Sequence, residues 1–370
     1  MVKQRFLKGF GFSNQSGSRF LLLLRLYRKY GVAKRYRTRA FLNAILAFVL
    51  SFFALLDRLV WFLVKRKVGY VADPLFIIGH WRSGTTLLHD LLCLDERAGY
   101  TTTFQTVFPN NLFGFNKPLV WIMGRLMPAH RPVDKVPLNP HRPQEEEFGL
   151  GNITELCYYM WWYFPDAWPD ILEKYLTLDR LSTQDLARWK KTYKTFIARA
   201  LLYQHKHWLV SKNPPNTARI KHLLDMYPDA RFIYLTRNPY EVYVSSQRFF
   251  KAILEPLQLQ EIDEETFKQN ILDAYCLLYD NYQKTKSLIP KNRLVEISYE
   301  QFIADEVRYL RSIYAQLEMK LHASTVDKWQ YAISINKHAP NKYNFTRETI
   351  YEVNKALGNR IEEMGYERLS

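Results

Sequence analysis

The chain has 370 residues, of which 48% are hydrophobic and 15% aromatic, so it can bury a substantial core. Its three cysteines, Cys93, Cys157 and Cys276, are scattered without a C-x-x-C pair, which excludes a disulfide framework and a cysteine zinc site and suits a reducing compartment. The formal net charge is +16, but residues 1–70 hold fifteen Lys and Arg and one acid, Asp57. The rest of the chain is therefore nearly neutral, and the basic charge belongs to an N-terminal module.

Two basic and apolar segments stand in this module. The first is RFLLLLRLYRKY, residues 19–30. The second is an apolar run, residues 40–56, which continues after Asp57 and Arg58 as LVWFLV and is flanked by KRYRTR and KRK. At 100° per residue, the second run forms a helix with one polar or small-residue face. That face consists of Asn43, Ala47, Ser51, Ala54, Asp57 and Arg58.

This apolar helix has three interpretations. Its length of about 25 residues is enough to span a bilayer. Both flanks are basic, however, so the charge asymmetry of a spanning helix is missing, and no small-residue cleavage site follows that would indicate a secretory signal. In-plane attachment to a membrane surface fits the basic and apolar mixture better, with a buried core helix as the other alternative. We expect a cytoplasmic protein whose residues 19–67 attach it to the cytoplasmic face of a membrane, with no nucleic acid as partner.

From Asp73 onward, short apolar runs alternate with helical patterns. PLFIIG leads directly into TTLLHDLLCL, and HWLVSK, RFIYLTR and RLVEISY are further strand candidates that precede breakers and helical stretches. This alternation predicts an α/β fold with a doubly wound, mainly parallel sheet flanked by helices. We predict a helical extension over residues 1–70 and a main domain over residues 71–370, with an insertion at about 101–207 where the pattern is less regular.

The strand–turn–helix at residues 77–92, IIGHWRSGTTLLHDLL, is similar to a phosphate-binding loop, G-x-x-x-x-G-K-[ST]. Gly79, Gly84 and Thr86 fit that pattern, but Thr85 stands in place of the lysine. In kinases that lysine contacts the β- and γ-phosphates, so its absence argues against a triphosphate ligand. The backbone N–H groups of residues 83–86 still form an anion cradle at a helix N-terminus, and Arg82 supplies a different cation.

A second group of candidate ligand residues lies in RFIYLTRNPYEVYVSSQRFF. Arg237 follows a predicted strand, where open α/β sheets bind ligands, and Pro239 suits the first turn of the next helix. Ser245 lies eight residues after Arg237. An Arg and a Ser that converge there predict a site for a second phosphate group.

The two motifs together, [KR]-S-G-T-T and R-[ND]-P-x-x-x-x-x-S, resemble the cofactor motifs of sulfotransferases that use 3′-phosphoadenosine-5′-phosphosulfate (PAPS), and SKNPPNTARIKHLLDMYPDARFIYLTRNP and RPQEEEFGL resemble the bacterial branch. The similarity covers roughly Pro74 to Tyr343. It implies a P-loop-like fold and an enzyme in which Arg82, Ser83, Gly84, Thr85 and Thr86 hold the 5′-phosphosulfate. Arg237 and Ser245 would then hold the 3′-phosphate, and no metal is needed.

The resemblance also implies how catalysis works. Sulfuryl transfer proceeds by in-line displacement, so positioning and charge stabilisation dominate. Negative charge grows on the bridging oxygen as the bond to the 5′-phosphate breaks. Arg82 and Lys212, which follows the HWLV strand and matches a family position, are the candidates to stabilise that charge.

The general base departs from the family pattern. The histidine of the animal cytosolic members is absent from SKNPP, and the glutamate of the tyrosylprotein members is absent from YTTTFQ. The nearest bases are in HRPQEEEF, where an extended chain would place Glu145 and Glu147 on one side. We therefore rank Glu145 first, Glu147 second and the loop residue His80 third as the general base. The non-catalytic alternatives are that the glutamates form a solvated acidic face and that the histidine only packs beside the loop.

The acceptor that we expect is a lipophilic alcohol such as a sterol or another lipid. The motivation is the apolar N-terminal helix and the aromatic sequence CYYMWWYFPDAW, residues 157–168, although such aromatics are as readily core residues. Two other functions compete with this one. They are a nucleotide kinase, which the missing lysine disfavours, and a catalytically silent, membrane-associated nucleotide-binding protein.

Overall fold

The computed structural model describes residues 14–65, 71, 73–130, 136–335 and 343–370. The chain forms two compact units, which are described separately below. Unit 1 comprises Met1–Tyr70, Tyr100–His205 and Arg248–Phe267, and unit 2 comprises Val71–Gly99, Lys206–Gln247 and Lys268–Ser370. The sequence-based division at residue 70 stays a prediction.

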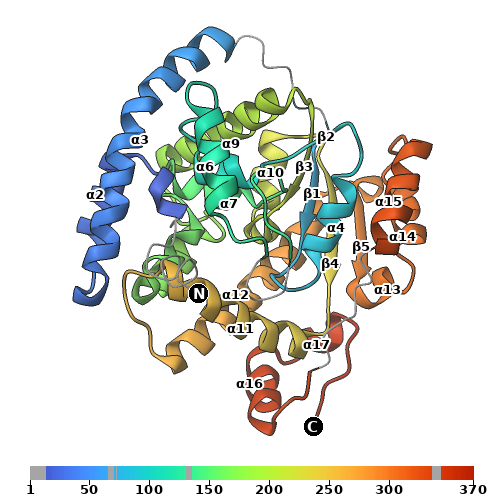
Figure 1. Ribbon diagram of the computed structural model, residues 1–370. Helices are drawn as coiled ribbons and strands as arrows, with labels where there is room; N and C mark the ends of the chain where they lie inside the picture. Colours follow the sequence, from blue (N-terminus) through green and yellow to red (C-terminus); the bar gives the residue numbers. More distant parts are fainter. Residues whose placement is uncertain (1–13, 66–70, 72, 131–135, 336–342) are drawn as a thin grey trace. The chain divides into compact units, whose positions relative to one another are not determined.

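Unit 2 contains a five-stranded parallel sheet of order β2-β3-β1-β4-β5 (Figure 1). This order puts β1 at the centre, so the loop after β1 lies between the carboxyl ends of two neighbouring strands. The predicted strands are all present, and only the two-residue β2 was missed. The strands are β1 Leu75–Ile78, β2 Ala98–Gly99, β3 Trp208–Lys212, β4 Arg231–Thr236 and β5 Leu294–Ser298.

Alternate residues of the strands face two helical layers, as the two-residue period of a strand requires. On one face Leu75, Ile77 and Ile233 belong to a large buried cluster that includes residues of α4, α13, α14 and α15. On the other face the ring of Phe76 packs against Tyr227, which follows α10. A sheet buried on both faces is the doubly wound arrangement predicted from the alternating pattern.

The helices of unit 2 are mostly short, and α11 and α12 have residues in both units. The α-helices of unit 2 are α4 Thr85–Leu92, α10 Ile220–Met226, α13 Tyr299–Ala304, α14 Glu306–Gln316, α15 Ala323–Ile335, α16 Arg347–Leu357 and α17 Arg360–Glu363. The 3-10 helices are η6 Pro214–Ala218, η7 Lys286–Leu288 and η8 Lys291–Arg293, and the shared helices are α11 Pro239–Leu257 and α12 Glu264–Thr285.

Unit 1 is helical in its described residues, and it joins the N-terminal segment to residues 100–205. Its α-helices are α2 Phe20–Tyr30, α3 Arg37–Val64, α5 Thr103–Val107, α6 Asn116–Leu126, α7 Glu146–Gly151, α8 Trp168–Tyr175 and α9 Thr183–Gln204. Its 3-10 helices are η1 Asn14–Gly17, η2 Lys34–Tyr36, η4 Tyr158–Trp162 and η5 Pro165–Ala167.

Helix α3 buries most of its predicted polar and small-residue face, although Ser51 is half-buried and Arg58 is exposed. The Asn43 amide oxygen accepts a hydrogen bond from Ser16 (3.3 Å), and the Ser51 hydroxyl accepts one from the backbone of Phe20 (3.0 Å). Asp57 is fully buried, and its carboxylate is paired with Arg199 of α9. Packing through the predicted polar face therefore leaves the opposite face, which is apolar, exposed.

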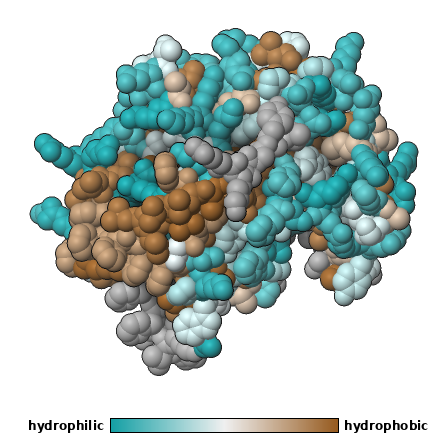
Figure 2. All heavy atoms as spheres, turned by 90° about the horizontal axis from the view of Figure 1, so that it is seen from above, coloured by the Kyte–Doolittle hydropathy of each residue, from teal (hydrophilic) through white to brown (hydrophobic). Residues whose placement is uncertain are grey.

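That exposed face is unusually rich in large hydrophobic side chains for one helix. In Figure 2 hydrophobic side chains gather in a broad patch on the left, the side on which α2 and α3 lie in Figure 1. In the described part of the chain, α3 is the helix whose length and composition would allow it to cross a membrane. The exposed residues are Phe41, Ile45, Leu46, Phe48, Val49, Phe52, Leu55, Leu56, Leu59, Phe62 and Leu63.

Candidate functional site

The loop between β1 and α4 has the tight backbone of a phosphate-binding loop. Gly79 and Gly84 have φ angles of +140° and +92°, which side-chain-bearing residues rarely adopt. A Cβ atom at Gly79 would lie 2.4 Å from the carbonyl oxygen of Leu235, and one at Gly84 would lie 2.3 Å from the ring of Tyr299. Both glycines are therefore required by conformation and by space.

The same loop is held in place by hydrogen bonds to its backbone. The Ser83 hydroxyl donates to the His80 carbonyl oxygen (2.6 Å). The hydroxyl of Thr217 accepts a hydrogen bond from the Gly79 N–H (2.8 Å). No described side chain caps the N-terminus of α4, so the first N–H groups of that helix point to where an anion would bind.

Arg82, Arg237 and Ser245 come together, although many residues separate them in the sequence. The Nε of Arg82 donates to the Ser245 hydroxyl (2.9 Å), and a terminal nitrogen of Arg237 donates to the Arg82 carbonyl oxygen (3.2 Å). Arg82 itself has a positive φ of +69°. The two motifs predicted to hold the two ends of one nucleotide are thus joined by direct hydrogen bonds within unit 2.

Arg237 is held in one orientation by its neighbours. Glu241, in the first turn of α11, accepts hydrogen bonds from its guanidinium at 3.0 and 2.6 Å. The guanidinium also lies over the ring of Tyr299, 4.4 Å from its centroid. Only 8% of Arg237 is exposed, so its orientation is set before any ligand arrives.

Lys212 ends β3 beside this loop. It is buried and stands in register with Ile77 of β1, two residues before Gly79. The lysine therefore lies at the carboxyl edge of the sheet, level with the start of the loop.

His80 is a buried residue of the loop itself. Its ring stacks on Tyr275, with 4.3 Å between centroids, and its Nδ1 lies 2.7 Å from the Trp81 carbonyl oxygen. Nδ1 must carry the proton to donate there, which leaves Nε2 as an acceptor; in the described part of the chain Nε2 has no partner. Burial lowers the pKa of His80 to about 4, so the ring is neutral at pH 7. Its surroundings match the packing interpretation better than a catalytic one.

Three residues of this site escaped the sequence analysis. Tyr299 is the last residue of the predicted strand segment 293–299 and directly follows β5, so its place at the carboxyl edge was available as a signal. Glu241 lies four residues after Arg237, the spacing of an ion pair on a helix. Thr217 gave no signal, because only the fold brings η6 against β1.

The three glutamates predicted to supply the base lie in unit 1. The alternation of an extended chain does not apply to them, because α7 begins at Glu146 and Glu145 precedes its first turn. All three are buried, which also contradicts a solvated acidic face. Tyr159 donates to Glu145, the Tyr193 hydroxyl donates to Glu146 (2.6 Å), and the Tyr158 N–H donates to Glu147 (2.8 Å).

The aromatic segment 157–168 forms part of the core of unit 1. Trp161 and Trp168 stack with 3.6 Å between ring centroids, and Phe250 contacts both edge-on. The aromatic residues of this segment are each at most 3% exposed. The segment therefore fits the core alternative, and it gives no separate support for an acceptor pocket.

No group of three or more His, Cys, Asp or Glu side chains among the described residues is placed to hold a metal ion. A parallel sheet with a phosphate-type loop after its central strand defines a nucleotide-binding α/β protein. A model of the Sulfotransferase family matches residues 74–323, about two thirds of the chain. The chain belongs to the sulfotransferase family, and it is an enzyme.

The omega-hydroxy-beta-dihydromenaquinone-9 sulfotransferase Stf3 of Mycobacterium bovis is 31% identical over 333 residues, which cover 89% of this chain and 84% of the relative. The protein of the same name from Mycobacterium tuberculosis matches equally well. Among solved structures, the sulfotransferase STF9 from Mycobacterium avium has a TM-score of 0.70 at 17% identity, covering 95% of this chain and 97% of its own. STF1 from Mycobacterium tuberculosis H37Rv has a TM-score of 0.63 at 16% identity, with 90% of each chain covered. These two structures confirm the fold, and the family excludes the kinase interpretation.

Proposed function

We propose that this sulfotransferase moves a sulfuryl group from PAPS to the hydroxyl of a lipophilic acceptor. The observation that carries the donor assignment is the pair of hydrogen bonds that joins Arg82 to Ser245 and Arg237 to Arg82. A nucleotide with anionic groups at its 5′ and 3′ ends needs two anion sites side by side. These bonds are consistent with two such sites in unit 2.

In this proposal the N–H groups of residues 83–86 and the Arg82 guanidinium bind the 5′-phosphosulfate. Arg237 and Ser245 bind the 3′-phosphate. Arg237 would exchange part of its pairing with Glu241 for the phosphate, and its stacking on Tyr299 keeps the guanidinium in place during that exchange. Phosphate is the stronger partner because its charge is higher.

The reaction breaks the bond between the sulfur and the bridging oxygen of the donor and forms one between the sulfur and the acceptor oxygen. The electron pair of the broken bond stays on the 5′-phosphate, where Arg82 and Lys212 stabilise the added charge. The proton of the acceptor hydroxyl passes to a general base. The products are adenosine 3′,5′-bisphosphate and the sulfate ester.

For the base we keep Glu145 first, Glu147 second and His80 third. Glu145 is the most exposed of the three adjacent glutamates, at 8%, whereas Glu147 is fully buried and accepts a backbone hydrogen bond. A base must reach a hydroxyl brought by the substrate, which favours the least buried carboxylate. His80 ranks last because the loop and Tyr275 enclose it.

A lipophilic acceptor is supported by two observations. The relatives at 31% identity are named for a menaquinone-type lipid acceptor. Helix α3 exposes a hydrophobic face that would lie in the interfacial region of a bilayer. We therefore propose that the extension 1–70 attaches the protein to the cytoplasmic face of a membrane and that residues 101–207 contribute to acceptor binding in the domain 71–370.

The substitution Arg237→Ala tests the donor site. Adenosine 3′,5′-bisphosphate should bind more weakly by about 1.5–3 kcal/mol, because a charge-assisted contact to the 3′-phosphate is lost. Isothermal titration calorimetry measures the loss. Arg293→Ala is the matched control. Arg293 directly precedes β5 and is ion-paired with Asp229, so it lies at the amino-terminal end of the strands, whereas the donor site lies at their carboxyl ends.

The wild-type protein should also be stabilised against thermal unfolding by the bisphosphate and not by ATP with Mg²⁺. Unchanged affinity of Arg237→Ala for the bisphosphate would refute the assignment of the 3′-phosphate site. Binding of the bisphosphate without any turnover of labelled PAPS on lipid extracts would contradict the proposed activity while leaving the site intact.

A further inference from the structure

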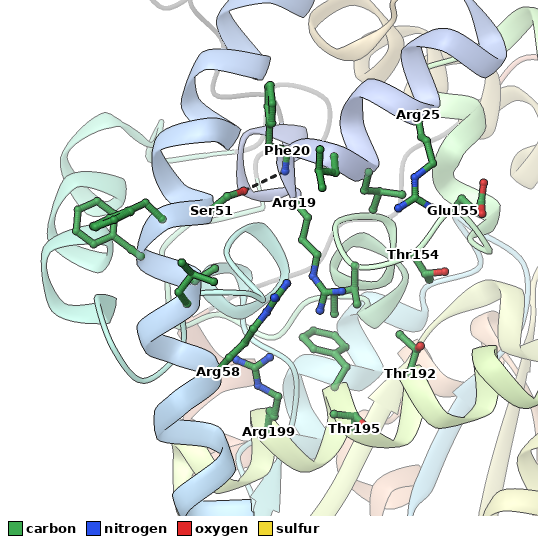
Figure 3. Close-up of a pocket in the computed structure, with 18 of the residues that line it drawn as sticks. Arg19, Phe20, Arg25, Ser51, Arg58, Thr154, Glu155, Thr192, Thr195 and Arg199 are labelled. Atoms are coloured by element: carbon green, nitrogen blue, oxygen red, sulfur yellow. Dashed lines mark hydrogen bonds between the residues drawn. The ribbon is translucent and has the colours of Figure 1, made fainter.

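Unit 1 contains a large groove whose lining includes none of the residues proposed to hold the donor. It has a volume of about 1080 Å³ and is lined by α2, α3, α9 and residues 153–155 (Figure 3). We call it the N-terminal groove. Its size is at the upper end of the range for small-molecule sites.

Basic side chains dominate the polar part of the N-terminal groove. Glu155 is the single carboxylate of its lining, and it is already close to Lys29 (3.9 Å) and Arg188 (3.7 Å). The lining therefore carries a large excess of positive charge, which attracts anions. Its basic residues are Arg19, Arg25, Arg58, Arg188, Lys191 and Arg199.

Three of these arginines come from three different helical regions and point toward one another in Figure 3. Arg19 precedes α2 and donates to Asn110 (3.0 Å). Arg58 comes from α3 and makes no ion pair or hydrogen bond with any described side chain. The positive charges of Arg58 and Arg199 add to the effect of burial in lowering the pKa of Arg19. These guanidinium groups repel one another.

Arg199 adds a buried donor to this cluster. It is 8% exposed and is paired with Asp57, yet its Nε has no hydrogen-bond partner in the described structure. A buried N–H without an acceptor destabilises the folded protein, because the group has lost its hydrogen bonds to water. An anion in the groove would supply the missing acceptor and offset the repulsion among the arginines.

Another part of the lining of the N-terminal groove is apolar. It includes Phe48, Val49 and Phe52 of α3, which belong to the exposed hydrophobic face of that helix. A molecule with its charged group at the arginines could therefore extend apolar chains along α3 without leaving the groove. Free inorganic anions would use only the basic part of this surface.

We propose that the N-terminal groove binds one anionic membrane lipid, with the phosphate of its headgroup at Arg19, Arg58 and Arg199 and its acyl chains along α3. This site is distinct from the donor site of unit 2. The inference rests on the proposed membrane attachment for the source of the lipid. The headgroup site itself is testable in solution, without any membrane.

The test compares two soluble short-chain lipids, dihexanoyl phosphatidylglycerol and dihexanoyl phosphatidylcholine, by calorimetric titration of the full chain. The wild-type protein should prefer the anionic lipid. Arg58→Gln and Arg19→Gln should each weaken that binding about tenfold or more, as expected for loss of a charge-assisted contact to phosphate. Arg37→Gln, an exposed arginine at the start of α3 outside the groove, is the matched control and should bind as the wild type does.

Affinity for adenosine 3′,5′-bisphosphate should be the same in all four proteins, which separates this site from the donor site and checks the fold. Equal affinity of the wild type for the two lipids would overturn the proposal, as would equal losses in Arg58→Gln and Arg37→Gln. If inorganic phosphate stabilises the protein as strongly as the anionic lipid does, the groove is a site for free anions and the lipid assignment is wrong.

Discussion

At the scale of single residues, the same side-chain chemistry has different consequences in different surroundings. Three adjacent glutamates are buried in unit 1, each accepting a hydrogen bond from a tyrosine side chain or a backbone N–H. His80 is buried too, but its Nε2 has no described partner. The sequence analysis chose the glutamates and His80 as candidate bases because they are the nearest bases to the loop. Burial and hydrogen bonding now distinguish what each substitution should do.

The general base is predicted to be Glu145. Glu145→Gln should keep normal affinity for adenosine 3′,5′-bisphosphate while turnover falls about 10²–10⁴-fold, because the amide cannot accept the acceptor's proton. Glu147→Gln is tested next. Glu146→Gln is the control, because it removes the same negative charge from the neighbouring position. Turnover is measured with labelled PAPS. If the variants at 145 and 147 turn over normally and His80→Asn binds cofactor without turnover, the carboxylate assignment is wrong.

The burial of His80 predicts that the free energy of unfolding depends on pH. Burial lowers the pKa of His80 from about 6.5 in the unfolded chain to about 4. Between these two values the unfolded chain binds a proton that the folded protein does not. The free energy of unfolding therefore has its full value above pH 6.5 and falls as the pH drops toward 4. The loss amounts to about 3 kcal/mol over that window. Denaturant unfolding of His80→Asn should therefore depend less steeply on pH between 6.5 and 4 than that of the wild type.

The control for this experiment is His141→Asn, which replaces an exposed histidine and should leave the wild-type slope unchanged. The absolute stability of His80→Asn at pH 7.5 does not decide the question, because the variant also loses the stacking on Tyr275. A variant with the full wild-type slope would show that other groups cause the acid sensitivity.

At the scale of elements, the strand–loop–helix unit from β1 to α4 depends on two glycines for its course. Gly84 has a positive φ and lies against the ring of Tyr299, which in turn lies under the Arg237 guanidinium. The loop that would bind the 5′ end of the donor is thus packed, through one tyrosine, on the arginine that would bind the 3′ end.

Gly84→Ala should lose about 1–2 kcal/mol of stability from the left-handed backbone and about 1–3 kcal/mol more from the contact with Tyr299. Gly365→Ala is the matched control. Gly365 has a similar φ of +82° but open space around its Cβ position, so only the backbone cost applies. Equal losses in denaturant unfolding, or unchanged bisphosphate affinity in Gly84→Ala, would contradict the packing argument.

At the scale of the whole molecule, the unequal distribution of charge and hydropathy separates two tasks. The basic and apolar residues concentrate in the N-terminal 70 residues, whereas the cofactor motifs lie in the nearly neutral remainder. Helix α3 packs through its polar face and buries Asp57 against Arg199. Its apolar face remains exposed in the described structure, as an interfacial helix requires.

Membrane attachment is predicted to depend on that face. Phe41→Ser and Phe62→Ser change exposed residues of α3 outside the N-terminal groove, and each should reduce co-sedimentation with neutral phosphatidylcholine vesicles, since burial of a Phe side chain contributes about 1.5–3 kcal/mol. Tyr351→Ser, which changes an equally exposed aromatic residue of α16, should have no effect. Equal binding by all variants would sink the interfacial assignment of α3.

The sequence by itself determined the family and the parallel α/β fold, and it supplied the residues that we propose for both ends of the donor. Local rules govern these features: a short apolar run ending in glycine predicts a strand and a phosphate-type loop wherever it occurs. The tertiary structure alone decided that α3 turns its polar face inward, that residues 157–168 are core, and that the glutamates belong to a helix. It also brought Arg19, Arg58 and Arg199 into one groove. Such outcomes depend on which surfaces segments distant in sequence bury against each other, and no local pattern contains that information.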